Sequence, residues 1–263
     1  MPIDLWLIDA FTEAPFAGNP AGVCLLPTAR PAEWMQAVAR EMNQAETAFL
    51  TKRKDGFDLR WFTPVTEVDL CGHATLASAH YLWAKRKAPA GGKITFHTRS
   101  GLLTASRRSG WISLDFPATP PAPCDPPPYL LDALKAQGAP AFKTAFDFMV
   151  VTEHPAKLRA LKPDFRLLRA IETRGVILTS PSDEPGVDFI SRFFAPASGI
   201  DEDPVTGSAH CALAPYWAKR LGKRILVGRQ VSARGGVVRV EHTGDRVLLG
   251  GKAVTVVKGT LAE

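Results

Sequence analysis

A cysteine, a glycine and a histidine stand in a row at Cys71, Gly72 and His73, where a run of small apolar residues begins. The run from Ala74 to Trp83 contains no charged residue, which is typical of a helix that is buried on every side. The first N–H groups of a helix have no partner within it and have partial positive charge, and glycine lets a ligand approach them closely. The start of this helix can therefore bind a carboxylate, although Gly-His is also an ordinary way to begin a helix.

A second helix start of the same kind follows a group of acidic residues. The segment "GIDEDPVTGSAHCALAPYWAKRL" places Gly207 and Ser208 at the beginning of another apolar run. Pro204 restrains the backbone directly after Asp203, so we expect that carboxylate to lie near the start of the second helix. The alternative is an acidic loop exposed to solvent.

Glu46 is a further acidic candidate, in "MNQAETAFLT". It lies between a segment with helical spacing, Pro31–Asn43, and an apolar strand. Burial at the start of such a strand would raise the pKa of its carboxyl toward the range useful for proton transfer. From the residues alone, a surface glutamate after a helix is the stronger interpretation.

Three segments recur in the same order along the chain. Arg60–Pro64, "RWFTP", resembles "RFFAP" at 192–196, and Gly72-His73-Ala74 resembles Gly207-Ser208-Ala209. "RSGLLTASRRSGWISL", from residue 99, resembles "RGGVVRVEHTGDRVLL", from residue 234, at nearly the same offset. Such order and spacing predict an internal duplication, and two copies can place their helix starts face to face across a ligand cleft.

The domain boundary is predicted at the proline-rich segment 117–128, "PATPPAPCDPPP", which favours an extended connector. We assign residues 1–118 to a first domain and 129–263 to a second, with the extreme C-terminus allowed to return to the first. Each copy combines short strands with one apolar helix. The predicted fold is therefore α+β, with two pseudo-symmetric domains, each an antiparallel, barrel-like sheet around a central helix.

Composition excludes several classes of protein. Hydrophobic residues make up 46% and charged residues 22% of the chain, as in soluble globular proteins, and no apolar run is long enough for a membrane span. The N-terminus "MPIDLWLIDAF" indicates a first strand rather than a signal peptide, so we expect a cytoplasmic protein. The net charge of +6 is scattered in short clusters, which does not favour nucleic-acid binding. The four cysteines lie far apart, without the spacing of a structural metal site or a disulfide framework.

Four motifs together resemble the PhzF-like phenazine biosynthesis family: "DAFTEAPFAGNPAGVCLL", "NQAETAFL", "RWFTPVTEVDLCGHATLASAH" and "DEDPVTGSAH". The resemblance implies the fold of diaminopimelate epimerase, with the site between two similar domains. The family's best-known member is an isomerase that acts on trans-2,3-dihydro-3-hydroxyanthranilate. The resemblance also implies that the protein uses no metal and no organic cofactor, and that its usual assembly is a homodimer.

The resemblance also assigns roles to residues, and it reverses the interpretation of Glu46, which corresponds to the family's acid/base glutamate. His73 and Asp203 correspond to residues that line the site and assist proton transfer. The residues implied to contact the substrate are Asn19, Gly72, His73, Gly207 and Ser208.

Cys71 is the point at which a related mechanism fails. Epimerases of this fold use two opposed cysteines, one before each helix, but the second position here is Thr206. An alcohol cannot replace a thiolate as acid or base, so the two-thiol mechanism is broken. We predict a cofactor-independent isomerase that moves a proton on a small carboxylate-bearing substrate similar to dihydro-hydroxyanthranilate. The alternatives are an amino-acid racemase or epimerase, and a non-enzymatic protein that binds a metabolite or a partner protein.

Overall fold

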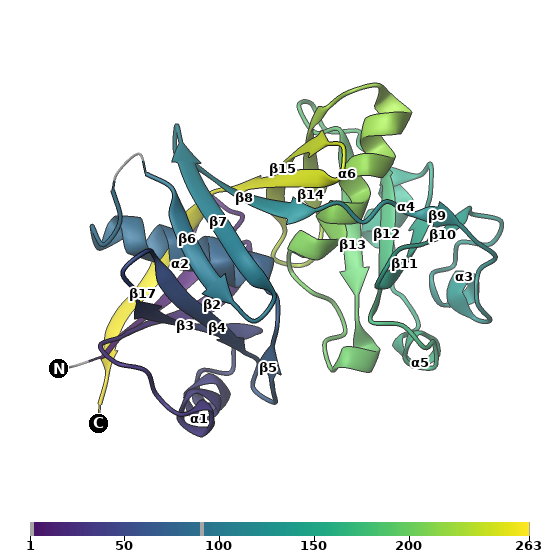
Figure 1. The fold of residues 1–263 in the computed structure, drawn as a ribbon. Coiled ribbons are helices and arrows are strands. Elements are labelled where there is room, and N and C mark those ends of the chain that lie inside the picture. The colour runs from purple at the N-terminus through teal and green to yellow at the C-terminus, as the bar shows by residue number, and fades with distance from the viewer. Residues whose placement is uncertain (1–2, 90–91, 263) are drawn as a thin grey trace. The chain divides into compact units, whose positions relative to one another are not determined.

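The computed structural model describes residues 3–89 and 92–262, and the chain divides into two compact units (Figure 1). Unit 1 comprises residues 1–116 and 250–263, and unit 2 comprises residues 117–249. Strands outnumber helices in both, so the fold is a sheet-dominated α+β fold. Among the described residues, no helix has the length and apolarity needed to cross a membrane.

Unit 1 is built on one sheet. Its strands pair in the order β17-β1-β2-β3-β4-β6-β7-β8, with β5 added to β4. The C-terminal strand of the chain is thus part of unit 1, where it pairs antiparallel with the first strand. The elements are β1 (Ile3–Ala10), β2 (Asn19–Leu26), α1 (Ala32–Met42), β3 (Glu46–Lys52), β4 (Phe57–Phe62), β5 (Glu67–Val68), α2 (Gly72–Ala84), β6 (Ile94–Thr98), β7 (Gly101–Arg108), β8 (Trp111–Pro117) and β17 (Ala253–Leu261).

Unit 2 has a second series of paired strands, in the order β9-β10-β11-β12-β13-β14-β15. Its elements are β9 (Ala122–Pro123), α3 (Leu130–Ala133), β10 (Ala141–Lys143), β11 (Asp147–Val151), α4 (Pro155–Ala160), α5 (Phe165–Arg169), β12 (Gly175–Pro181), β13 (Phe189–Phe194), the 3₁₀ helix η1 (Pro196–Ser198), α6 (Gly207–Leu221), β14 (Ile225–Gln230) and β15 (Gly236–Thr243). Strand β16 (Arg246–Gly251) begins in unit 2 and ends in unit 1.

The prediction of purely antiparallel sheets is wrong. In unit 1, β2 pairs parallel with β3 and β4 pairs parallel with β6. In unit 2, the pairs β11–β12 and β13–β14 are parallel. Two neighbouring strands can be parallel only if the chain crosses over between them, usually through a helix. A helical connection joins the two strands of each of these pairs: α1, α2, α4 with α5, and α6.

Helix α2 is the buried element that the sequence predicts. From His73 to Trp83 only His80 is partly exposed, and the helix packs against β1, β2, β3 and β17. Its two buried hydroxyl groups bond back to the helix: Thr75 Oγ1 donates to the carbonyl of Cys71 at 2.5 Å and Ser78 Oγ to that of Ala74 at 2.7 Å. Small side chains and internally bonded hydroxyls together allow the strands to pack closely on it without leaving these two hydroxyls unpaired.

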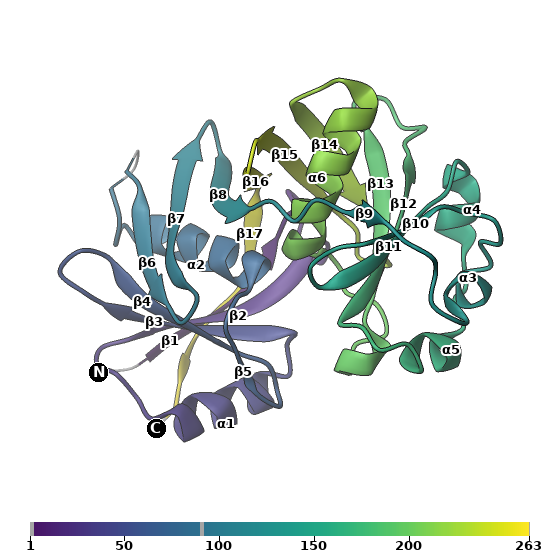
Figure 2. The ribbon, with the colours of Figure 1, turned by 45° about the vertical axis from the view of Figure 1, so that its right-hand side comes forward.

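Helix α1 lies on the other side of β1, β2 and β3 from α2, as Figure 2 shows. It begins after Pro31 and ends at Met42, within the segment for which the sequence predicts helical spacing, and the left-handed conformation of Asn43 caps it. Met35 and Ala39 of α1 pack with Phe49 and Phe62 of the sheet. Strands β2 and β3 are therefore covered on both faces, which explains their nearly continuous apolar sequences.

Strand β13 in unit 2 is also covered on both faces, and its residues alternate between them. Phe189 stacks on Trp217 of α6 with ring centres 5.7 Å apart. On the opposite face, Phe194 contacts the ring of Phe165 in α5. Because β13 lies within the sheet and is buried along its length, its end holds the start of the loop 195–206, which leads into α6.

Candidate functional site

Three predicted site residues of unit 1, Asn19, Glu46 and His73, meet at the start of α2 together with Cys71. Asn19 is the first residue of β2 and Glu46 the first of β3, and these parallel neighbours begin at the same edge of the sheet. Cys71 is the N-cap of α2 and His73 lies in its first turn. The fold therefore brings together residues that are far apart along the chain.

His73 is the centre of this group. Its Nδ1 lies 3.2 Å from Nδ2 of Asn19 and 3.5 Å from Sγ of Cys71. On the other side of the ring, Nε2 lies 3.2 Å from Oε2 of Glu46, although the pair does not have the geometry of a hydrogen bond. Burial lowers the pKa of His73 to about 3, an effect that a hydrogen bond with the carbonyl of Pro20 opposes. The ring is thus neutral near pH 7, with one nitrogen directed to a carboxylate.

Glu46 is the more accessible partner. Its side chain is 17% exposed, against 7% for that of His73, so a small molecule can reach the carboxylate more readily than the imidazole. An ionised carboxylate can accept a proton from a carbon acid and return it, and the adjacent imidazole can bind or orient a polar group of the substrate.

A glycine turn positions Asn19. Gly18 has a φ of 67°, and a Cβ there would lie 2.1 Å from the carbonyl oxygen of Ala10. Only glycine fits this turn, which directs the chain into β2 with the Asn19 side chain buried. The "AGNPAG" motif therefore has a structural reason as well as a predicted contact with the substrate.

The start of α6 in unit 2 is a second polar cluster. Thr206 is the N-cap, Gly207 and Ser208 open the first turn, and Ser208 is partly exposed. Oγ1 of Thr206 donates to Oδ2 of Asp203 at 2.5 Å, and the amide of Asp203 donates to the carbonyl of Phe193 at 3.0 Å. Thr206 thus occupies the same helical position as Cys71, but its hydroxyl is engaged by a carboxylate.

The acidic segment before α6 separates into three different environments. Glu202 makes two contacts of 2.7 Å with Arg192, which is 8% exposed and also donates to the carbonyls of Leu158 and Leu161. Asp201 contacts an exposed arginine at 3.2 Å. Of the three, Asp203 is therefore the carboxylate that belongs to the helix start.

The sequence analysis missed Gln230. This residue ends β14, is fully buried, and bridges the loop before α6. Its Oε1 accepts from the amide of Thr206 at 2.9 Å, and its Nε2 donates to the carbonyl of Asp203 at 2.7 Å. The alternation of side chains along a strand could have indicated this role, because it places Gln230 on the same buried face as Leu226 and Gly228, where a polar side chain needs a partner.

Neither α2 nor α6 has a side-chain hydrogen bond from its own N-cap residue. The N–H groups of the first turns are therefore not capped in the usual way by Cys71 or Thr206, and each helix start retains donors suited to an anionic group. This agrees with the predicted contacts of Gly72, His73, Gly207 and Ser208, which remain predictions.

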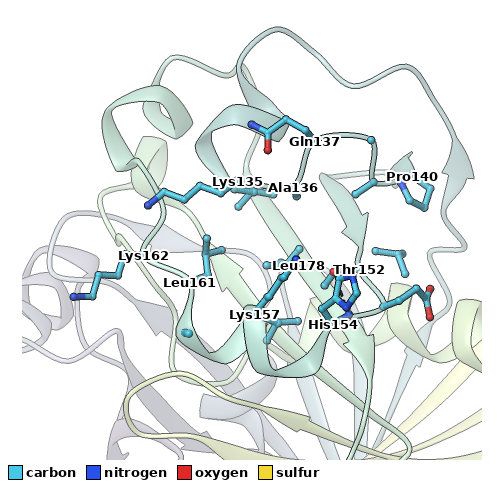
Figure 3. A pocket seen from close by; sticks show the side chains of 17 residues that line it. Lys135, Ala136, Gln137, Pro140, Thr152, His154, Lys157, Leu161, Lys162 and Leu178 are labelled. Carbon is cyan, nitrogen blue, oxygen red and sulfur yellow. Dashed lines mark hydrogen bonds between the residues drawn. The ribbon is translucent and has the colours of Figure 1, made fainter.

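A pocket of about 630 Å³ lies elsewhere, within unit 2, between the loop that follows α3 and the helix α4 (Figure 3). Leucine side chains and Val151 line its interior, and lysine side chains lie around it; Figure 3 shows those of Lys135 and Lys162 extending toward the same side. None of the predicted site residues lines this pocket. The predicted site and the pocket are therefore different places in the chain.

Comparisons with known proteins agree with the resemblance in the motifs. The profile of the PhzC-PhzF family, described as phenazine biosynthesis-like protein, matches residues 8–259. The "Uncharacterized isomerase BH0283" of Halalkalibacterium halodurans is 51% identical over 262 residues, which are 99% of each chain. A crystal structure of a PhzF-family protein from Enterococcus faecalis is 40% identical, with a TM-score of 0.95 and complete coverage of both chains.

More distant structures share the fold alone. A probable proline racemase from Agrobacterium radiobacter aligns with a TM-score of 0.64 at 13% identity, over 99% of this chain and 93% of its own. The fold is thus common to PhzF-like proteins and to racemases, and the family is decided by the closer matches. The chain belongs to the phenazine biosynthesis-like family that the PhzC-PhzF profile describes.

Proposed function

We propose that the protein is a cofactor-independent isomerase that moves a proton between two carbons of a small carboxylate-bearing substrate, similar to a dihydro-hydroxyanthranilate. The observation that supports this most is the contact of 3.2 Å between Oε2 of Glu46 and Nε2 of His73 in a largely buried site. Two similar proteins, from Halalkalibacterium halodurans and Pseudomonas aeruginosa, have the name "uncharacterized isomerase", which supports the reaction class.

In the proposed reaction, the Glu46 carboxylate removes a proton from a carbon next to a double bond or a carboxylate. It then returns that proton, or in D₂O a deuteron that has exchanged onto the carboxyl, to another carbon on the same face, so that the substrate's double bond shifts. His73, held by Asn19, orients the substrate's amino or hydroxyl group, and Asp203 assists. The N–H groups at Gly72, His73, Gly207 and Ser208 bind the substrate carboxylate.

A second candidate, an amino-acid racemase or epimerase, has one observation in its favour. Sγ of Cys71 lies 3.5 Å from Nδ1 of His73, and an imidazole can assist ionisation of a thiol. However, the position that would supply a second thiol is Thr206, whose hydroxyl donates to Asp203. A single base that serves one face fits these residues better than two bases on opposite faces.

We further propose that the two units are copies of one ancestral domain with a barrel-like sheet. Each has a strand, a crossover helix and a parallel strand: β4, α2 and β6 in unit 1, and β13, α6 and β14 in unit 2. The arginine that begins the recurring motif binds a glutamate in both units. Arg60 binds Glu67 at 2.6 and 2.8 Å, and Arg192 binds Glu202 at 2.7 Å. The homodimer implied by the resemblance is also a proposal, and sedimentation equilibrium would test it.

The reaction class can be tested by incubating the protein in D₂O with a panel of small carboxylates: cyclic dienoates with amino or hydroxyl groups, and free amino acids. NMR and mass spectrometry would follow the products. The proposal expects a positional isomer of one cyclic compound, with deuterium only at the carbon that receives the proton. Inversion at the α-carbon of an amino acid would instead support the racemase.

A further inference from the structure

The residues Glu46, Cys71 and His73 have a property that the proposed isomerisation does not use. One donor atom from each lies within 4.8 Å of the donor atoms of the other two. Within residues 3–89 and 92–262, this is the one group of three or more histidine, cysteine and acidic side chains gathered so closely. We propose that these three residues form a binding site for Zn²⁺, which inhibits the protein reversibly.

The types of donor suit this ion. A thiolate, an imidazole nitrogen and a carboxylate oxygen are the ligands that zinc binds in proteins, and three protein ligands leave a fourth position for water or another small molecule. Softer donors also exclude the common alternatives, because Mg²⁺ and Ca²⁺ bind oxygen ligands. The set is therefore selective for zinc and its close relatives.

The distances are close to those of a tetrahedral zinc site. Ligands at bond lengths of about 2.0–2.3 Å lie roughly 3.2–3.8 Å apart around a tetrahedral ion. Nε2 of His73 and Oε2 of Glu46 are 3.2 Å apart. Sγ of Cys71 lies nearest to the other ring nitrogen, 3.5 Å from Nδ1, so the thiol must rotate toward the Nε2 side of the ring to reach the ion. The rotation it needs is short, because one donor atom from each of the three residues already lies within 4.8 Å of the others.

His73 supplies a second, independent sign of a ligand. The residue is 5% exposed, and its Nε2 is buried without a hydrogen bond although it is directed toward the Glu46 carboxylate. A buried ring nitrogen without a hydrogen bond costs free energy of folding, and an ion or ligand bound between Nε2 and the Glu46 carboxylate would remove that cost. Asn19, next to Nδ1, can orient a metal-binding histidine when its amide is turned so that the oxygen faces the ring, because Nδ1–H then donates to that oxygen and Nε2 has a lone pair for the ion.

The consequence for activity rests on the proposed function. A zinc ion bound here takes the carboxylate that would remove the proton, so Glu46 can no longer act as a base. The ion is therefore an inhibitor and not a cofactor, and removing it with a chelator should restore turnover.

Binding can be measured without any substrate. The protein, treated with a chelator and a thiol reductant, would be titrated with Zn²⁺ against a metal-sensitive dye, and separately with Co²⁺. A cobalt–thiolate bond gives a charge-transfer absorption in the near ultraviolet, so this band reports coordination by a cysteine. We expect one ion per chain with the cobalt–thiolate band. Replacing Cys71 with Ser should remove the band and weaken zinc binding by about 100-fold or more, as loss of a direct ligand exceeds loss of a second-shell partner.

The matched control is Cys124→Ser, because that cysteine is partly exposed and lies in unit 2. This variant should bind zinc as the wild type does. If Cys71→Ser does not fold, Glu46→Gln provides the same test, because its partly exposed side chain can change without a buried cavity. Equal zinc affinity in the wild type and either folded ligand variant would overturn the proposal, as would the absence of binding. Zinc binding without isomerase activity would leave the metal site standing while contradicting the proposed function.

Discussion

Gln230 offers a test of how the loop before α6 is held in place. In Gln230→Leu the side chain keeps roughly its volume but loses both the acceptor for the Thr206 amide and the donor to the Asp203 carbonyl. Thr206 is 8% exposed, so water cannot readily replace the lost acceptor. An unpaired buried N–H costs about 1–3 kcal/mol, and the second lost hydrogen bond about 0.5–1.5 kcal/mol.

These contributions add to about 3 kcal/mol, which lowers Tm by roughly 6–12 °C in a chain of this size. Differential scanning calorimetry and urea denaturation would measure the change. Gln137→Leu is the matched control, because Gln137 is exposed and bonds one exposed aspartate. That variant should change the free energy of unfolding by less than about 0.5 kcal/mol. If Gln230→Leu were as stable as Gln137→Leu, the bridge would not hold the loop and the reasoning would be wrong.

Three further predictions concern charge and reactivity. Burial lowers the pKa of His73 to about 3 and that of His210 to about 4, below the usual 6.5. At a pH between the folded pKa of each histidine and 6.5, the unfolded chain binds more protons than the folded one. The free energy of unfolding should therefore decrease as the pH falls below about 6.5, by up to about 1.4 kcal/mol per pH unit for each histidine. Urea denaturation of a folded His210→Gln variant should show a shallower pH dependence, and an unchanged slope would refute the assignment. Cys71→Ser should keep turnover within about tenfold of wild type if Glu46 is the base; complete loss of activity in a folded variant would favour the racemase. Asp203→Asn should lower kcat by about 10- to 100-fold and leave Tm nearly unchanged, because the amide oxygen still accepts from Thr206; wild-type kcat would exclude Asp203 from the reaction.

Local patterns in the sequence predicted the helices that position the site. The uncharged run after Gly72 forms the buried helix α2, and the segment from Pro31 to Asn43 contains the helix α1. These predictions succeeded because burial and helical spacing are recorded in residues within a few turns of one another. The parallel strand pairs were missed because pairing joins strands separated by a whole helix, and no short pattern records it.

The contacts within the site could not be predicted from local patterns either, because they join residues that lie far apart along the chain. Glu46 looked like an ordinary surface residue until the motifs suggested a family, and only the fold places its carboxylate beside His73. Gln230 lies 24 residues after Thr206, so their hydrogen bond has no signature in either segment. The acidic group before α6 looked uniform, but a buried arginine on a neighbouring strand engages Glu202 and leaves Asp203 at the helix start.

The central claim is that Glu46 is the base of a proton-moving isomerase. The most direct measurement is the rate of deuterium incorporation into the first substrate identified, for wild type, Glu46→Gln and the control Glu41→Gln, whose glutamate is exposed in α1. The account predicts that Glu46→Gln lowers the rate by about 100- to 10,000-fold, or about 3–5 kcal/mol in activation free energy, with Tm and the Glu41→Gln rate near wild type. A folded Glu46→Gln protein that exchanges deuterium within about tenfold of the wild-type rate would contradict it.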